Sequence, residues 1–436
     1  MSEPVRPSAT EPYRAAFETV RPDLRGLPEQ RRAAFARFAE LGFPGPREEA
    51  WKYTSLRRLE SRRFAPSLRD AAAAAAVVLP ESLGAARVVL VNGNLRADLS
   101  TLAALPASVR LTAPGATQDE PGVSAAVLGW TEGGGTERFA ALNAAMCPDP
   151  LLVEAGPGAD GQTVLHVIAV ATGAAPSMSF PRLVLRVASG ARLRVVLQHV
   201  GDDAVEHFVS SCVDAAVADG GELHLYRLQA SGSKTFHIER CDGTVGAGGR
   251  LHLRDAQLGG SLGRVDLNVA LVGKASEAEL TGLYLADGSR HLDTHVRIDH
   301  RAVDTRSLQD FRGIAANRGR AVFNGKTVVH EGAQKSNARQ SSRNLLLTPG
   351  AEIDTKPELE IYADDVQCSH GATTGQLDPA ALFYLRSRGL SESEARSALT
   401  RAFAGAVLSR IDHAALAARV HDELDQRLTR LLEQPA

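Results

Sequence analysis

Short, similar segments recur along the middle of the chain at intervals of about 29 residues, a spacing typical of repeat proteins. One such unit is too small to bury its own apolar face, so neighbouring units have to stack. A later pair of apolar residues, Val322 and Ile353, falls at a similar interval. The four clearest repeat starts are Gly190-Ala191-Arg192-Leu193, Gly221-Glu222-Leu223, Gly249-Arg250-Leu251 and Ala278-Glu279-Leu280. This repeat constrains the fold more than any other feature of the sequence and predicts a solenoid.

The repeats contain short segments of alternating apolar and polar residues, the pattern of β-strands with one buried face. These segments cover residues 164–170, 183–187, 193–197, 223–228, 251–253, 265–272 and 295–298. The competing all-β fold, a sandwich, needs hairpin turns about every 8–12 residues. Asn-Gly and Asp-Gly pairs are too scarce here to supply them at regular spacing. We therefore predict a mainly β fold whose core is a right-handed parallel β-helix, or β-solenoid.

Helical patterns are expected on the N-terminal side of this core. Residues 29–41 carry apolar side chains at helical spacing, and Gly42 and Pro44 end the pattern. The apolar face of this helix is Ala34, Phe35, Phe38 and Leu41. Trp51 and Tyr53 follow as expected packing anchors, because large aromatic side chains are most often part of the core.

Three further helices are expected on the C-terminal side. The first begins at Asp378 and Pro379, and the second begins with a capping box at Ser391 and Glu394. The apolar stripe of the second helix is Ala395, Leu399, Ala402, Phe403, Ala406 and Val407, and that of the third is Leu416, Val420, Leu424, Leu428 and Leu431. Such stripes usually pack within the molecule, but short helices beyond a solenoid also suit the docking of a partner.

A chain of 436 residues can bury a large core and should contain two or three structural units. We divide it into an N-terminal helical region at 1–75, a parallel β-helix at 76–375 and a C-terminal helical domain at 376–436. An alanine run at 71–76 is expected to be a hinge or a short helix.

Cys368 and His370 lie two residues apart where β-rich sequence gives way to helix. On an extended strand such residues face the same side, so the thiol and the imidazole could bind one soft or borderline metal ion. Two ligands do not complete a zinc or iron–sulfur site, which takes about four. Distant residues or a partner chain complete the set, or the metal only passes through. The alternative is a buried cysteine and a core histidine at a domain junction.

A second group of metal-ligand residue types lies on a predicted strand at 291–300. His291, Asp293 and His295 alternate onto one face of this strand, which is a reasonable ligand arrangement. The alternative is a hydrogen-bonded polar ladder on the outside of the solenoid or at a subunit edge.

The most specific stretches of the sequence are Gly319–Lys326, Ala338–Gln340, Asn344–Leu347, Lys356–Ile361, Asp364–Val366, Cys368–Thr373 and Phe383–Gly389. Nearer the N-terminus, the element Glu48-Glu49-Ala50-Trp51-Lys52-Tyr53-Thr54 follows Gly42-Phe43-Pro44. In these stretches the chain resembles the SufB/SufD family of iron–sulfur cluster assembly proteins, and within it the SufD branch. The resemblance covers most of the chain, is most specific from Gly319 on and is weaker in the N-terminal element. The family is built on a parallel β-helix, in agreement with the repeat pattern.

The resemblance implies a non-catalytic scaffold that pairs with a SufB-like subunit and carries a SufC-like ATPase on its C-terminal helices. A transient iron–sulfur cluster, or its iron, would be held near the interface between the two related subunits. On that basis His370 is the first candidate ligand and Cys368 the second, and a shared site explains their incomplete number. The sequence leaves room for a flavin without showing one, and it is compatible with a homodimer of the isolated chain.

Composition narrows the remaining function classes. A net charge of -2 gives no reason to expect binding to nucleic acid or to a membrane surface. No apolar run approaches the roughly 20 residues of a membrane span, and 4 scattered cysteines suit the reducing cytoplasm. The alternative function is a β-helix polysaccharide lyase or hydrolase. Such enzymes are usually secreted, and the expected absence of an export signal disfavours this alternative.

Overall fold

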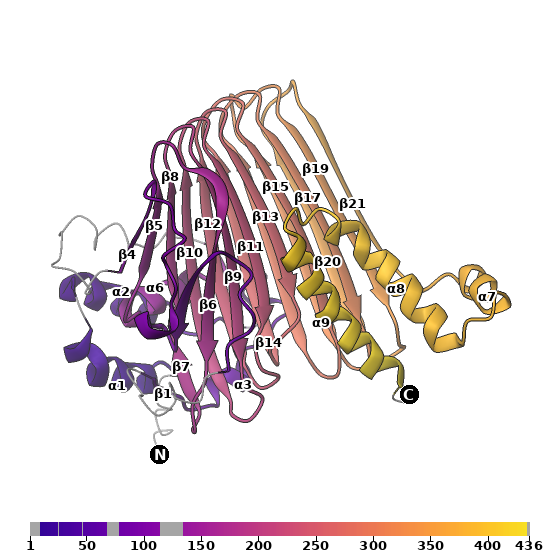
Figure 1. The fold of residues 1–436 in the computed structure, drawn as a ribbon, viewed down its shortest axis with the longest axis horizontal. Coiled ribbons are helices and arrows are strands. Elements are labelled where there is room, and N and C mark those ends of the chain that lie inside the picture. The colour runs from indigo at the N-terminus through magenta and orange to yellow at the C-terminus, as the bar shows by residue number, and fades with distance from the viewer. Residues whose placement is uncertain (1–8, 25, 46, 68–77, 114–133, 434–436) are drawn as a thin grey trace, which may run out of the picture.

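The computed structural model describes residues 9–24, 26–45, 47–67, 78–113 and 134–433. Strands that wind into a solenoid form the body of the molecule, and helices flank it at both ends of the chain (Figure 1). The strands are β1 (Ala65–Pro66), β2 (Ala86–Val91), β3 (Asn94–Leu95), β4 (Val109–Thr112), β5 (Leu151–Ala155), β6 (Asp160–Ala171), β7 (Ser177–Ser179), β8 (Arg182–Val187), β9 (Arg192–Gly201), β10 (His207–Val217), β11 (Glu222–Ala230), β12 (Phe236–Val245), β13 (Arg250–Gln257), β14 (Leu262–Leu271), β15 (Glu277–Ala286), β16 (His291–His300), β17 (Arg306–Ala315), β18 (Arg320–Val329), β19 (Asn337–Leu346), β20 (Glu352–Ile361) and β21 (Gln367–Gly375). The helices are α1 (Glu11–Val20), α2 (Pro28–Leu41), α3 (Arg57–Glu60), α6 (Glu137–Met146), α7 (Pro379–Ser387), α8 (Glu392–Leu408) and α9 (Ala414–Glu433), with short 3-10 segments η1 (Arg21–Asp23), η2 (Glu49–Trp51) and η3 (Ala97–Leu99).

Successive strands of the solenoid alternate between two sheets. The even sheet runs in the order β20-β18-β16-β14-β12-β10-β8-β5-β4, and the odd sheet runs in the order β21-β19-β17-β15-β13-β11-β9-β6-β2-β3. Pairing between neighbours is parallel from β8 to β20 and from β9 to β21. The predicted mainly β fold with a solenoid core is therefore confirmed, and the sandwich alternative is wrong.

The register of the repeats agrees with the sequence for the first three units. Leu193 lies beside Leu223, which lies beside Leu251. The fourth unit is displaced, because Leu251 lies beside Ala278 and not beside Leu280. The repeat that begins at Leu251 is shorter than the repeat before it. The pairing of the fourth unit is therefore shifted by two residues, and a shift of two keeps the same face of the strand buried.

Alternate residues of every rung point into the space between the two sheets and fill it with aliphatic side chains. Burying one such side chain contributes about 1.5–3 kcal/mol. Two glycines make room for aromatic rings of adjacent rungs: a Cβ at Gly282 would collide with the ring of Phe311, and one at Gly313 would collide with the ring of Tyr284. The interior is thus packed by complementary large and small residues.

The N-terminal helices cover the outer face of the even sheet at its N-terminal end (Figure 1). The helix expected at 29–41 is α2, which ends at Gly42 with φ of +58°, a conformation that glycine adopts without strain. Trp51 is buried as expected, whereas Tyr53 is only half-buried. Aromatic rings dominate the contact with the sheet: Phe17, Phe35, Phe38, Phe139, Phe208 and Phe236.

The C-terminal helices α8 and α9 lie against the outer face of the odd sheet (Figure 1). The stripe predicted for α9 packs there, with Leu416, Val420, Leu424 and Leu428 buried. The stripe predicted for α8 is rotated, because Ala402 and Ala406 are exposed while Thr400, Ala404 and Leu408 are buried. No helix within the described ranges is long and apolar enough to cross a membrane.

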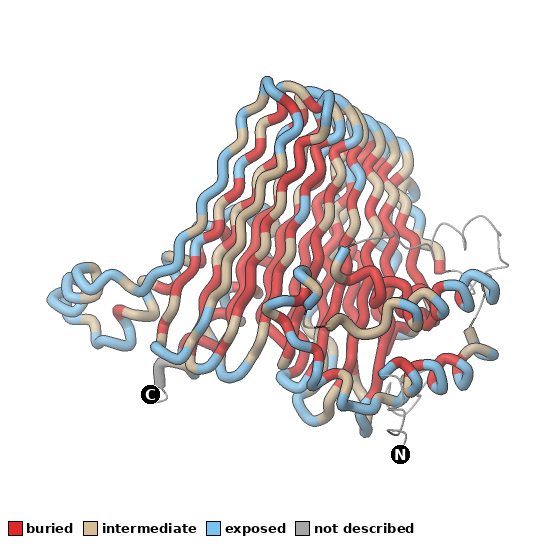
Figure 2. The backbone as a smooth tube through the Cα atoms, turned by 180° about the vertical axis from the view of Figure 1, so that it is seen from behind, coloured by how far each residue is buried: buried red, intermediate tan, exposed pale blue. Residues whose placement is uncertain are grey.

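The two ends of the solenoid differ. At the N-terminal end the antiparallel strands β3 and β4 close the edges of the two sheets. At the C-terminal end the full-length strands β20 and β21 have β18 and β19 as their sole strand partners among the described residues. Figure 2 shows the consequence, since the buried stripe of the middle rungs gives way to half-buried and exposed residues in the last strands. The alanine run at 71–76 and the expected boundary between residues 75 and 76 lie outside the described residues.

Candidate functional site

Cys368 and His370 both lie on β21, the last strand of the odd sheet. Their neighbours on β19 are Ala338 and Gln340, which are buried in the solenoid. Because neighbouring strands share a register, the thiol and the imidazole follow the inward-facing columns of the interior. Cys368 is half-buried and His370 is exposed. The two side chains are therefore at the uncovered end of the core and not sealed inside it.

The surroundings of the two side chains differ. Cys368 packs beside the small apolar cluster of Val329, Ala333 and Ala363. Burial raises the pKa of its thiol, so it is protonated in the isolated chain. The ring of His370 has no hydrogen-bond or ion-pair partner within the described part of the chain, and it is exposed at the end of the solenoid.

The rest of the open end consists of apolar residues at core positions that no further rung of the described solenoid covers. On β20, Ile353, Pro357 and Leu359 continue the inward columns of β18 and are only half-buried. Beside His370, the buried Gln340 donates to the carbonyl of Gly325 at 2.9 Å, while its Oε1 has no donor among the described residues. The end therefore combines apolar contact area with an unsatisfied polar group.

The His291 run does not form a metal site in the chain. Nε2 of His291 lies 2.8 Å from the hydroxyl of Thr54, and that hydroxyl donates to Asp293 at 2.6 Å. The other carboxylate oxygen of Asp293 lies 3.0 Å from Nε2 of His295. These side chains fasten the N-terminal segment to the outside of the even sheet, in line with the hydrogen-bonded alternative.

Arg264 completes this attachment, which we call the Trp51 latch: Trp51, Thr54, Arg264, His291 and Asp293. The guanidinium of Arg264 lies 3.9 Å from the centre of the Trp51 ring and 3.0 Å from Asp293. Burial alone would raise the pKa of the Asp293 carboxyl, but His295 and Arg264 hold it well below its usual range. The Trp-Lys-Tyr-Thr element therefore has a structural role, because its Trp51 and Thr54 form part of the latch.

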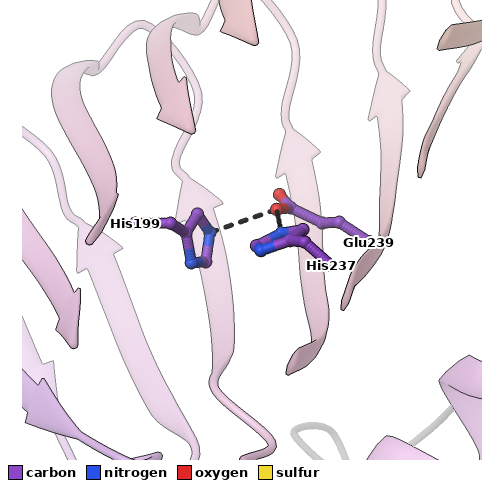
Figure 3. A group of neighbouring side chains, drawn as sticks. All are labelled: His199, His237 and Glu239. Carbon is purple, nitrogen blue, oxygen red and sulfur yellow. Dashed lines mark hydrogen bonds and ion pairs between the residues drawn. The ribbon is translucent and has the colours of Figure 1, made fainter. Parts of the chain in front are cut away.

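A buried polar cluster crosses the solenoid interior. His199 on β9 faces His237 and Glu239 on β12, and Nε2 of each imidazole lies near the same carboxylate oxygen, at 3.1 Å and 2.9 Å (Figure 3). Arg227 donates to both oxygens of Glu239 at 2.7 Å and 2.9 Å and also to Asp255. Because the guanidinium already saturates the carboxylate, the cluster ties the two sheets together as an ion-pair network.

Sequence reasoning missed this interior cluster and a second one on the outer face of the odd sheet. The second cluster consists of Glu222, His224 and His252. One signal could have identified it, because the two histidines occupy the same position in consecutive repeats, immediately after Leu223 and Leu251.

Comparisons with known proteins show the family to which the sequence is related. A family model described as the SufBD core domain of SUF-system FeS cluster assembly matches residues 168–403, which include Cys368 and His370. The chain is 32% identical over 411 residues to an iron–sulfur cluster assembly SufBD family protein of Synechocystis, covering 90% of this chain and 89% of that protein. It is 28% identical over 400 residues to the iron–sulfur cluster assembly protein SufD of Escherichia coli, covering 89% and 90%. A SufBD family protein of Mycobacterium tuberculosis is 27% identical over 421 residues, covering 94% of both chains.

Proposed function

The chain belongs to the SufBD family of iron–sulfur cluster assembly proteins, and from this premise we propose that it is a non-catalytic scaffold that pairs with a SufB-like subunit through the open end of its solenoid. The observation that carries this proposal is the uncovered last rung with Cys368 and His370 in it. The nascent cluster, or its iron, is the cargo held there. The names of the relatives favour this role over the lyase or hydrolase alternative.

The backbone of the last rung supports pairing with another chain. Each of β20 and β21 has one edge without a strand partner in the described part of the chain. Proteins usually shorten, charge or cover such edges, and repeat arrays need a cap at each end. A related subunit that adds its own strands would satisfy these backbone groups and cover the apolar core layer.

The side chains suit a transient, shared site. His370 offers an unpartnered imidazole, and Cys368 becomes a thiolate only when a metal or a nearby positive charge lowers its pKa. Among the described residues Cys368 and His370 belong to no group of three converging metal-ligand side chains, and the interior positions beside them on β19 are Ala338 and Gln340. A ligand set completed across the interface would release its cargo more easily than a closed four-thiolate site.

For the SufC-like ATPase, α7 is the best-placed docking element. The apolar faces of α8 and α9 are used for packing on the odd sheet, whereas α7 projects from the body of the molecule (Figure 1). It exposes Phe383 and Tyr384, which are 76% and 56% accessible. Neighbouring large aromatics exposed to this degree are typical of interaction sites.

The proposal is tested with His370→Ala in the chain co-expressed with its SufB-like and SufC-like partners. We expect the complex to assemble normally, as judged by size-exclusion chromatography, but to form less cluster on anaerobic reconstitution, as judged by visible absorption and by bound iron and sulfide. Ser369→Ala is the matched control, because Ser369 is also exposed on β21 but alternates to the opposite face.

Equal cluster yield from His370→Ala and the wild-type complex would contradict the assignment of this residue. Cys368→Ala should have a smaller or similar effect on cluster yield. A large loss of thermal stability in that variant, without loss of cluster, would show that the thiol only packs against Val329, Ala333 and Ala363.

A further inference from the structure

A group of polar residues lies on the outer face of the odd sheet, on the opposite side of that sheet from the interior columns that end at Cys368 and His370. Glu222 and His224 are two residues apart on β11, so their side chains point the same way. His252 on β13 is the direct register partner of His224, and Glu279 on β15 is the partner of His252. The parallel repeat therefore places two imidazoles side by side with carboxylates on both sides of them.

The nitrogen and oxygen atoms of three of these residues converge. Nε2 of His224 lies 2.7 Å from Oε1 of Glu222, and Nε2 of His252 lies 3.8 Å from the same oxygen. The two rings are stacked with centres 4.5 Å apart and planes 28° apart. One ligand atom from each residue lies within 4.8 Å of the others. A small cation could contact all three after modest side-chain movement.

The far side of each imidazole also faces a carboxylate. Nδ1 of His224 lies 3.3 Å from Oδ2 of Asp412, in the turn between α8 and α9, and Nδ1 of His252 lies 3.5 Å from Oε2 of Glu279. Histidines that bind metals usually donate their other ring N–H to a carboxylate or carbonyl, which fixes the tautomer and directs Nε2 at the ion. Here each Nδ1 has a carboxylate at ion-pair distance, and a small rotation of either side chain would complete the hydrogen bond.

The charges around the cluster leave the ligand atoms available. Arg192 lies 3.4 Å from Oε2 of Glu222, the oxygen that does not face the imidazoles. Arg254 and Arg410 pair with Glu279, at 3.2 Å and 3.0 Å.

We propose that Glu222, His224 and His252 bind a divalent metal ion of borderline softness, Zn²⁺ or Fe²⁺, with Asp412 and Glu279 orienting the two imidazoles. Two histidines and one carboxylate are a common ligand set for both ions, and they leave coordination positions open to water or to a transferred group. Glu222 and His252 are half-buried and His224 is buried, and His252 and Glu279 line a surface groove of about 570 Å³ through which an ion could reach the His252 side of the cluster.

Metal binding at this position would also tie the C-terminal helices to the solenoid. Asp412 is in the described turn between α8 and α9, and its other oxygen accepts a hydrogen bond from Tyr226 at 2.5 Å. An ion that orders His224 therefore orders Asp412 and the start of α9. The site is independent of the proposed cluster site, because none of its residues lies on β20 or β21.

The test uses the full chain carrying Cys368→Ser and His370→Ala, so that the open end contributes no metal ligand. We expect this protein to bind one Co²⁺ or Zn²⁺ by calorimetric titration, with visible d–d bands for Co²⁺ and no thiolate charge-transfer band. Added metal should raise the Tm. Adding His224→Gln and His252→Gln should abolish the bands and the Tm shift, and adding Asp412→Asn alone should weaken binding ~10–100-fold.

Two histidine variants are the controls. His421→Gln changes an exposed histidine of α9, and His237→Gln changes the interior cluster. Both should keep metal binding, and circular dichroism should show that every variant is folded. Binding that survives in the His224→Gln/His252→Gln protein, or that is lost with His421→Gln or His237→Gln instead, overturns the proposal. A parent protein that binds no metal overturns it as well.

Discussion

Arg227 is the only guanidinium that the described residues place between Glu239 and Asp255 in the solenoid interior. The side chains of all three are at most 2% exposed. Substituting Arg227→Met keeps a similar apolar volume and removes the one positive charge. Two carboxylates then remain in the interior without a guanidinium: the imidazoles of His199 and His237 contact Glu239, and Gln257 donates to Asp255.

The cost follows from the desolvation of unpaired charge. Removing one partner of a buried ion pair costs about 3–5 kcal/mol, because the remaining charge loses its compensation. With an entropy of unfolding of about 2.1 cal/mol/K per residue, a chain of 436 residues has about 0.9 kcal/mol/K, so a loss of about 4 kcal/mol lowers Tm by about 4 °C.

The pH dependence has a defined sign. In the wild type the pKa of Glu239 is held well below its usual range: burial opposes this, and Arg227, then His199, overcome the effect of burial. Its contribution to stability is therefore present above pH ~4 and lost as the pH falls. Burial already raises the pKa of Asp255 in the wild type, with Arg227 opposing it; without Arg227, burial raises the folded pKa of both carboxyls, so the variant is most stable below pH ~4 and loses stability as the pH rises. The difference between the two proteins should widen from pH 4 to pH 7, mainly through Glu239, by up to about 1.4 kcal/mol per pH unit until the full loss is reached.

Urea and thermal unfolding followed by circular dichroism at pH 4.5, 5.5 and 7 measure the effect. Arg110→Met is the control, because Arg110 pairs with Glu154 at the surface and such a pair contributes about 0–1 kcal/mol. The triple variant Arg227→Met/Glu239→Gln/Asp255→Asn should regain most of the stability. The reasoning would be refuted if Arg227→Met lost no more stability at pH 7 than Arg110→Met does. It would also be refuted if the difference in stability between Arg227→Met and the wild type did not narrow at acidic pH.

Two further predictions concern the surface of the solenoid. Thr54→Val removes the hydroxyl that donates to the buried carboxylate of Asp293 and should lower the free energy of unfolding by about 1.5–3 kcal/mol at pH 7. Thr54→Ser keeps the hydroxyl and should be close to the wild type. Equal losses in both variants would show that the methyl group matters and not the hydroxyl. Phe383→Ala/Tyr384→Ala should leave Tm unchanged, since both side chains are largely exposed, but should lower the amount of SufC-like ATPase that co-purifies with the chain; unchanged co-purification would place the ATPase elsewhere.

Much of the fold could be predicted because the repeat and the strand period are both local in sequence. Leu193, Leu223 and Leu251 recur at nearly constant spacing and stack in register. The predicted alignment of the fourth repeat was wrong because a shortened repeat cannot be located from apolar spacing alone. Similarly, Ala402, Ala404 and Ala406 are equivalent by hydropathy, and only the packing of α8 on the odd sheet decides which of them is buried.

The candidate sites also differ in how much of each could be predicted from residues that are close together in the sequence. Cys368 and His370 share one strand, so the strand period was enough to place them together. His224 and His252 come together only through the register of two repeats, and Asp412 is contributed from far along the chain by the way α8 and α9 fold back on the sheet. The interior cluster needs both sheets to face each other, with His199 from one and Glu239 from the other.

The uncovered last rung has a consequence for how the protein is made in the cell. A chain that emerges from the ribosome folds from its N-terminus, so each newly translated coil shields the edge of the coil before it. Within the described residues only the coil of β20 and β21 has no successor, and in the proposed function a partner subunit takes the place of the next coil. Premature termination of translation would leave a different edge free, one that lacks Cys368 and His370, so on that proposal the chain gains its joining edge only when its last coil has been made.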